Sequence, residues 1–520
     1  MMRHQSYYQY LTLNGAQLFT VVCLPCESGK FPTVILRRPY ADNERFMSED
    51  EVCGNKLNDY AYWIEAGYAV VYQHCRGTGK SGGDCIPYIN EREDGLFLQN
   101  WIRKQPFYNG ELYLYGFSYL SSVHYVTAPF ASDIKGAILE AQDCERYNCN
   151  YRNGFYKMGL HGGWYFEMYK KNSALKKNYT PDSYKTLPLS ELSKKILGEK
   201  AEDFDEILRH PDRNDEFWST RYGGGEAHNA IKHAGIPILL VTGFYDIYTG
   251  GIFDMWRDLD ESTRELCALV VHPFDHSWNG EHQPISFENG TVKEAFGLYK
   301  VDWLNSIRGK CEPPFERGKV TYYKLFENKW CCDEFCDAND IMKIELGKES
   351  VTYRYDPRDP AVFKGGLCTN FGGSAWQNAP NSRGHIITLY TREFDKDTFI
   401  KGKMRASLTI SSDCEDTCFY VRVSLCKSEG DYGLRDDINQ ISNFDTEYLP
   451  NRQIEMSFTF DEHAFVIKKG ERLRIDISSS AWPHYVPHTN QKGLFSEQKI
   501  AKIANNTVYL AESYIELPIF

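Results

Sequence analysis

The sequence predicts a protein of two parts, an α/β domain built on a parallel sheet followed by an all-β domain. In the first part, short apolar strand-like segments alternate with helix-like segments, which favours parallel strands joined by right-handed crossovers. From about residue 316 the helix-like segments stop, and segments of alternating apolar and polar residues follow one another between Gly, Pro, Asn and Asp. That second pattern is typical of a β-sandwich or jelly roll.

Size and composition agree with a soluble, multi-domain protein. A chain of 520 residues is long enough for two or three domains, and 42% hydrophobic with 25% charged residues is ordinary for a globular protein. The net charge of −12 argues against nucleic acid as a partner. Because the start of the chain lacks an apolar leader and no long apolar run follows, we expect a cytoplasmic protein without a membrane span.

The 16 cysteines have irregular spacing, and most lie inside apolar segments. Cys331, Cys332 and Cys336 come close together, and Cys414 and Cys418 form a second group. Neither group has the paired C-x2-C spacing of a zinc site. We therefore expect reduced thiols, no metal and no cofactor.

The first 150 residues give the alternating pattern in chain order. Short, apolar segments rich in β-branched residues are the predicted strands: 32–40, 68–75, 111–116 and 135–142. Two segments with helical spacing of apolar residues are the predicted helices: 55–67, which ends on Gly67, and 92–105.

The pattern is interrupted from about 145 to 234, where Tyr, Lys, Asn and Gly crowd together and no strand is convincing. We read this part as a helical insertion. Strand-like segments return at 236–246 and 266–276, and a helix is predicted over 292–309. The expected division of the chain has four parts: 1–144, 145–234, 235–315 and 316–520.

The segment "LYLYGFSYL" places Ser118 between a predicted strand and a predicted helix. Nucleophilic serines sit on such turns in the pattern G-x-S-x-G, but position 120 is Leu. A serine at this place is more often a helix N-cap. The decision between the two readings depends on residues that follow later strands.

In a serine hydrolase of this topology the acid and the histidine follow later strands, in the order Ser, Asp, His. Asp246 comes directly after one later strand and His276 directly after the next. The serine needs an imidazole to take its proton, and the imidazole needs a carboxylate to fix its tautomer. Asp254 and Asp275 remain alternative acids, and His272 an alternative base. The backbone N–H of Tyr119 would be one oxyanion donor.

At this point the chain resembles the cocaine-esterase-like (CocE/NonD) serine hydrolases, which are related to the X-prolyl dipeptidyl-peptidases, the α-amino-acid ester hydrolases and the glutaryl acylases. The resemblance covers nearly the whole length and is carried by these motifs: GFSYLS, LRRPY, GFYD, HPFDH, YDPRDPAVFKGG and IKKGERLRIDISSSAWPHY. It implies an α/β hydrolase fold with an inserted helical cap, followed by a C-terminal all-β jelly-roll domain. It also implies Ser118, Asp246 and His276 as the catalytic triad.

The resemblance implies further roles. Tyr40 of LRRPY corresponds to the family's second oxyanion donor, and Ser121 replaces the final glycine of the family's G-x-S-Y-x-G. Phe117, Trp164 and Tyr165 are candidates for the substrate pocket, although a packed cap interior explains the last two equally well. A third set, Glu140, Asp143 and Glu145, could bind a free amine, or could be ordinary solvated carboxylates.

Three functions follow as hypotheses. The first is hydrolysis of an ester or amide of a small acyl substrate through an acyl-enzyme. The second is an X-prolyl dipeptidyl-peptidase-type aminopeptidase acting on short peptides, and the third is a non-catalytic ligand-binding protein. The resemblance leaves a homo-oligomer open, since relatives often self-associate.

Overall fold

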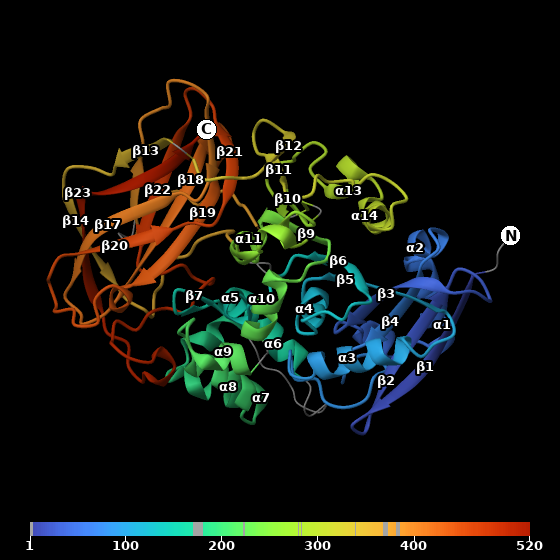
Figure 1. Cartoon of the computed structure of the whole chain (residues 1–520). Coiled ribbons are helices and arrows are strands. Elements are labelled where there is room, and N and C mark those ends of the chain that lie inside the picture. Colours follow the sequence, from blue (N-terminus) through green and yellow to red (C-terminus); the bar gives the residue numbers. More distant parts are fainter. Residues whose placement is uncertain are drawn as a thin grey trace.

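A ten-stranded sheet is the framework of the first part of the chain (Figure 1). The computed structural model describes residues 4–169, 180–221, 224–278, 280–281, 283–338, 340–367, 373–380 and 385–520. The strand order is β1-β2-β4-β3-β5-β6-β9-β10-β11-β12. The strands from β4 to β11 in this order run parallel, and the pairs β1–β2, β2–β4 and β11–β12 are antiparallel. The strand bounds are β1 Gln5–Leu13, β2 Ala16–Leu24, β3 Phe31–Arg38, β4 Ala69–His74, β5 Tyr108–Phe117, β6 Ile134–Glu140, β9 Ile238–Tyr245, β10 Ala268–Asp275, β11 Val320–Lys324 and β12 Lys329–Asp333.

Helices connect the parallel strands, as the alternating sequence pattern predicts. They are α1 Glu49–Asp59, α2 Ala61–Glu65, α3 Glu91–Ile102, α4 Tyr119–Tyr125, α11 Thr249–Asp258, α12 Glu261–Arg264, α13 Val292–Phe296 and α14 Tyr299–Ile307. The single helix predicted over 55–67 is two helices, and α1 begins earlier because Ser48 and Glu51 form a capping box. The helix predicted over 292–309 is divided at Gly297, which has a positive φ of 59°.

The segment between β6 and β9 consists mainly of short helices. Its elements are α5 Arg146–Asn150, β7 Tyr151–Arg152, β8 Phe155–Tyr156, η2 Met158–Gly162, α6 Gly163–Met168, η3 Pro181–Lys185, η4 Leu189–Glu191, α7 Leu192–Leu197, α8 Glu202–Arg209, α9 Glu216–Thr220 and α10 Gly224–Lys232. The sequence predicts the helical character, but it does not predict the small β7–β8 pair.

Among the described residues, the C-terminal part of the chain consists of strands and loops apart from two short 3-10 turns, Ile441–Asn443 and Phe495–Glu497. One sheet has the order β20-β17-β23-β16-β21, with β13 and β14 also paired to β23, and the other has the order β15-β22-β18-β19. The strand bounds are β13 Asp340–Glu345, β14 Ser350–Tyr355, β15 Ile387–Tyr390, β16 Thr398–Gly402, β17 Arg405–Ser412, β18 Cys418–Lys427, β19 Gly430–Gln440, β20 Ile454–Thr459, β21 His463–Ile467, β22 Arg472–Ser478 and β23 Ala504–Ile519.

The strand pairing across residue 316 places the first two strands after it, β11 and β12, with the α/β part of the chain. β11 lies parallel to β10, with Val320 opposite Leu269, and β12 pairs with β11. These two strands therefore extend the ten-stranded sheet. The alternating pattern of β11 resembles that of the later strands, and the sequence alone does not distinguish which sheet accepts it.

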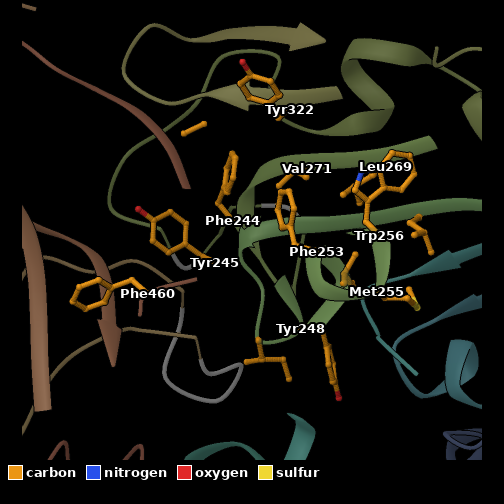
Figure 2. Close-up of a cluster of buried hydrophobic side chains, with 14 of the residues drawn as sticks. Phe244, Tyr245, Tyr248, Phe253, Met255, Trp256, Leu269, Val271, Tyr322 and Phe460 are labelled. Atoms are coloured by element: carbon orange, nitrogen blue, oxygen red, sulfur yellow. The ribbon is translucent and has the colours of Figure 1, made fainter. Parts of the chain in front are cut away.

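The core continues from the ten-stranded sheet into the all-β part. Figure 2 shows buried side chains from β9, α11, β10 and β11, and Phe460 of the all-β part belongs to the same core cluster as Tyr245 at the end of β9. The Tyr245 hydroxyl lies 3.0 Å from Nε2 of His463, and its ring centroid is 6.0 Å from that of Tyr432. The all-β part thus packs directly against the end of β9.

Among the residues that the structure describes, no helix combines the length and the apolar character needed to cross a membrane.

Candidate active site

Ser118 occupies a sharp turn between β5 and α4. Its φ of 59° and ψ of −129° are uncommon for a residue other than glycine, and strain of this kind concentrates at functional sites. Its side chain makes no capping hydrogen bond to α4, so the N-cap reading does not hold. Gly116 is required by this turn, because a Cβ there would lie 2.1 Å from the carbonyl oxygen of Leu120.

Ser121 stands where the family motif has its last glycine, and its hydroxyl joins α4 to β6. Ser121 Oγ donates to the carbonyl oxygen of Glu140 at 2.8 Å and accepts from the Glu140 N–H at 3.0 Å. The residue is fully buried. A serine is therefore small enough for the close approach of helix and strand, and its two hydrogen bonds hold that approach.

Ser118, His276 and Asp246 form a continuous chain of hydrogen bonds. Nε2 of His276 lies 2.8 Å from Ser118 Oγ, and Nδ1 of His276 lies 2.9 Å from Asp246 Oδ2. Asp246 is fully buried, and its other oxygen accepts the N–H of Tyr248 at 2.9 Å. This geometry fixes the tautomer that leaves Nε2 free to accept the serine proton.

The structure places the alternative triad residues elsewhere. Asp254, on α11, pairs with Arg257 at 3.2 Å and with Lys403 at 3.1 Å. Asp275 accepts the N–H groups of Ser277 and of Gly373. His272 is buried within β10, where Nδ1 accepts the N–H of Phe274 and burial lowers its pKa to about 3. None of these three contacts Ser118.

Two hydrogen-bond donors lie beside Ser118, the backbone N–H of Tyr119 and the phenol of Tyr40. The N–H of Tyr119 is the first of α4, so it has no carbonyl partner within its own helix. Tyr40 hydrogen-bonds with the side chains of Trp164 and Ser118. Burial raises the pKa of the Tyr40 phenol to about 12, although these hydrogen bonds act in the opposite direction. The phenol therefore keeps its proton at neutral pH and can donate it in a hydrogen bond.

A cavity of about 480 Å³ opens at Ser118 and His276. Besides Tyr40 and Trp164, its aromatic lining consists of Tyr60, Tyr62, Tyr88, Tyr115, Phe117 and Tyr248. Of the three predicted pocket residues, Phe117 and Trp164 line the cavity and Tyr165 does not. Successive residues of a helix point in different directions, and the ring of Tyr165 packs inside the insertion at 5.1 Å from that of Phe204.

The carboxylates considered for amine binding do not reach this cavity. Glu140 is buried and pairs with Lys300 at 2.9 Å. Asp143 is buried, which raises its pKa to about 7, and it accepts the N–H of Glu145 at 2.7 Å. Glu145 pairs with Arg213 at 2.6 Å. In the part of the chain that the structure describes, no Asp or Glu lines the cavity at Ser118.

Sequence reasoning did not name most of the cavity lining, and Arg38, His161 and Tyr248 are three of the residues that it missed. Tyr248 follows Asp246 closely, and its ring centroid lies 5.6 Å from that of His276. Arg38 belongs to the LRRPY motif, two residues before Tyr40, so the motif could have indicated that Arg38 lies near the cavity. His161 lies in the irregular insertion, where no pattern indicates which side chains face inward.

Across the described ranges, no group of three His, Cys, Asp or Glu side chains gathers as a metal ion would require.

Comparison with known proteins identifies the family. The family profile described as X-Pro dipeptidyl-peptidase (S15 family) matches residues 14–278, which is more than half of the chain. A second profile, the X-Pro dipeptidyl-peptidase C-terminal non-catalytic domain, matches residues 333–515. The chain therefore belongs to the S15 family of hydrolases. The second match begins where β12 ends, in agreement with the strand pairing.

Individual relatives extend over nearly the whole chain. Cocaine esterase of Rhodococcus sp. (strain MB1 Bresler) is 22% identical over 580 aligned positions, covering 97% of this chain and 96% of that protein. Among solved structures, an aminopeptidase from a marine sediment archaeon (Thaumarchaeota archaeon) superposes with a TM-score of 0.82 at 17% identity, covering 100% of this chain and 97% of the other.

Two further structures share the fold. An α-amino acid ester hydrolase has a TM-score of 0.78 at 16% identity and covers 100% of this chain and 97% of its own. A CocE/NonD family hydrolase from Staphylococcus aureus has a TM-score of 0.67 at 13% identity and covers 99% of this chain and 94% of its own. The predicted family is confirmed, as is the prediction that the chain is a hydrolase with a C-terminal all-β domain.

Proposed function

We propose that this protein hydrolyses an ester or amide bond of a small acyl substrate through an acyl-enzyme formed on Ser118. The observation that carries the proposal is the hydrogen-bonded chain from Ser118 Oγ through His276 to buried Asp246, at the floor of an aromatic cavity. The strained turn at Ser118 supports it, because a vestigial or purely structural serine has no need of such a conformation.

The reaction would proceed in two halves. His276 Nε2 takes the proton of Ser118 as Oγ attacks the substrate carbonyl, and Asp246 stabilises the imidazolium that forms. The Tyr40 hydroxyl and the Tyr119 N–H donate to the oxyanion. His276 then gives its proton to the leaving group, and the acyl-enzyme remains. In the second half His276 activates water, which releases the acid and restores Ser118.

The cavity favours an esterase or amidase over an aminopeptidase. A free α-amine is bound by carboxylates or by carbonyl oxygens, and the described lining of this cavity contains no Asp or Glu. An X-prolyl dipeptidyl-peptidase-type activity remains the second candidate, since the matching profile carries that description. A non-catalytic ligand-binding role is the third.

The same proposal assigns a role to each part of the chain. Residues 145–234 would act as a helical cap, because His161 and Trp164 of this segment line the cavity. The α/β hydrolase domain would comprise 1–144 and 235 to about 333. The remaining residues, to 520, would form a jelly-roll domain that supports the loops bearing the acid and the histidine.

Initial rates on p-nitrophenyl butyrate and on an X-Pro p-nitroanilide test the function. We expect turnover of the ester by the wild type and loss of that turnover in Ser118→Ala. Ser122→Ala is the matched control, because Ser122 is a buried serine of the same helix outside the proposed triad. Preferred turnover of the anilide would favour the peptidase. Equal rates for wild type and Ser118→Ala would contradict the proposal.

A further inference from the structure

Arg37 and Arg38 are consecutive residues at the end of β3 with very different surroundings. Consecutive residues of a strand point to opposite faces of the sheet. Arg37 is buried and paired with Glu91 at 3.2 Å and with Asp94 at 3.6 Å. Arg38 is half-buried and lines the cavity at Ser118. The ion pairs of Arg37 are part of the buried fold, whereas packing of the fold does not explain why residue 38 is an arginine.

Arg38 has no acidic partner within the described residues. Its one side-chain hydrogen bond runs from Nε to the carbonyl oxygen of Tyr40, at 3.3 Å. No ion pair of the described chain includes it, so both Nη groups are available to a ligand. A guanidinium presents these donors in a planar fork that matches the two oxygens of a carboxylate.

Two carboxylates near this end of the sheet, Glu44 and the triad residue Asp246, already have partners. Glu44 pairs with Lys56 at 3.2 Å and with His74 at 2.8 Å. Asp246 is buried behind His276 and does not line the cavity. A second cation lies nearby, since the guanidinium of Arg146 sits 3.2 Å from the ring centroid of Tyr88, another lining residue.

The positive charges of Arg38 and Arg146 act on Tyr40, which lines the cavity together with Ser118. Arg146 and Arg38 both act to lower the pKa of Tyr40, against the larger effect of burial. An anionic substituent in this cavity would thus meet Arg38, with Arg146 close by against the ring of Tyr88, and no competing carboxylate of the described lining. A half-buried charge without a partner is also costly, and an anionic ligand would relieve that cost.

We propose that Arg38 binds a carboxylate carried by the substrate, so that this hydrolase prefers anionic esters or amides to their neutral counterparts. The inference rests on the proposed function, because it assigns the substrate class of the cavity at Ser118. The carboxylate is on the acyl group or on the leaving group, and the test below separates the two.

Two matched ester pairs measure the preference. Mono-p-nitrophenyl adipate against p-nitrophenyl hexanoate places the charge on the acyl group, at equal chain length. 3-Acetoxybenzoate against N-methyl 3-acetoxybenzamide places it on the leaving group. With spontaneous hydrolysis subtracted, we expect kcat/KM of the wild type to favour the anionic member of one pair by roughly 10-fold or more, the size of a charge-assisted hydrogen bond.

Substitution of Arg38 tests whether this residue causes the preference. Arg38→Met should bring the anionic-to-neutral ratio close to one, mainly by raising KM for the anionic ester, and Arg38→Lys should keep part of it. Arg392→Met is the matched control: it removes the same charge from an exposed site outside the cavity, and its ratio should equal that of the wild type.

The outcomes separate this inference from the proposed function. Ser118-dependent turnover of neutral esters, with no anionic preference in either wild-type pair, would overturn the role of Arg38 and leave the hydrolase proposal standing. An equal loss on both members of a pair in Arg38→Met would also overturn it, because that result describes a general effect on the oxyanion. If no ester is cleaved in a Ser118-dependent way, the proposed function fails first.

Discussion

Two buried strands, β9 of the ten-stranded sheet and β19 of the all-β part, fill the interior in opposite ways. All eight residues of β9, ILLVTGFY, are buried, and Thr242 is the only one with a polar side chain apart from the tyrosine. β19 is buried from Tyr432 to Asn439 and yet includes Arg435, Asp436 and Asp437. One strand relies on apolar burial, and the other on paired charges.

Charged side chains of the all-β part contact the insertion and the segment that follows Asp246. Arg152 of β7 pairs with Asp437 at 2.7 Å and with Asp461 at 2.7 Å. Gly250, close after Asp246, packs against Asp461 so tightly that a Cβ would lie 2.5 Å from its Oδ1. Apolar strands thus place the triad, while ion pairs join the parts around it. Changes at the triad should affect rate, and changes at the ion pairs should affect stability.

The largest expected effect is that of Asp246→Asn. The amide keeps the size of the side chain but holds the wrong tautomer of His276, so kcat should fall by roughly 10⁴-fold. Asp254→Asn, at the alternative acid, is the control, and it should change kcat by less than about threefold, because Asp254 forms partly exposed ion pairs with Arg257 and Lys403, away from Ser118. A larger loss in Asp254→Asn than in Asp246→Asn would reverse the assignment.

Tyr40→Phe should lower kcat by roughly 10²-fold to 10³-fold, the effect of removing one oxyanion donor. KM should change little, because the ring remains in the cavity. Tyr147→Phe removes a hydroxyl from the insertion, where it donates to the carbonyl oxygen of Pro211 at 3.0 Å, outside the cavity at Ser118. Equal losses in the two variants would show that Tyr40 acts through packing.

Arg152→Met should instead lower the free energy of unfolding, by about 3 kcal/mol at neutral pH, because it leaves two buried carboxylates without their partner. Burial opposes the charge of Asp461, but Arg152, Arg435 and Lys157 hold its pKa at about 2, below the usual 3.8. This stabilisation is complete above pH 4 and is lost as the pH falls through about 2.

Denaturant unfolding across that range measures the effect. The difference between wild type and Arg152→Met should shrink as the pH falls toward 2: Asp437, whose pKa burial raises, loses its charge first, and Asp461 loses its charge last. Arg358→Met breaks an exposed ion pair with Asp356 and should leave stability unchanged within error. A difference that is independent of pH would contradict the assignment to charge.

The smallest effect is expected for Ser121→Gly. It removes the two hydrogen bonds to the backbone of Glu140 and should cost about 1 kcal/mol of unfolding free energy. Activity should stay within about twofold, because the turn at Ser118 is set by Gly116 and by the packing of α4. A tenfold loss of kcat without loss of stability would place Ser121 in the catalytic machinery.

The sequence predicts the triad because each member directly follows a strand that contains a short apolar run. Ser118 follows β5, Asp246 follows β9 and His276 follows β10, and the C-terminal ends of parallel strands meet at one edge of the sheet. His276 lies 158 residues from Ser118, and only this topological rule brings the two together. The family resemblance adds Tyr40, which no periodic pattern indicates.

Other strands of the fold, and the cavity residues of the insertion, could not be predicted from the sequence, for physical reasons. β19 carries charges at buried positions, so its pattern does not read as a core strand. The 16-residue strand β23 depends on pairing with partners far away in the chain, and the local β1–β2 hairpin joins the sheet only through the pairing of β2 with β4. In the insertion, short helices do not show which residue faces the cavity, and Trp164 and Tyr165 differ by one position.

Covalent labelling with a fluorophosphonate tests the central claim most directly, because the reagent reacts with a serine only where a base has activated it. Peptide mass spectrometry should find a single adduct, on the peptide that contains Ser118, and Asp246→Asn should label far more slowly than the wild type. Loss of the adduct in Ser118→Ala, and its persistence in Ser122→Ala, is the result predicted here. An adduct on another residue, or ester hydrolysis by a protein that the reagent leaves unlabelled, would contradict the assignment of Ser118 as the nucleophile.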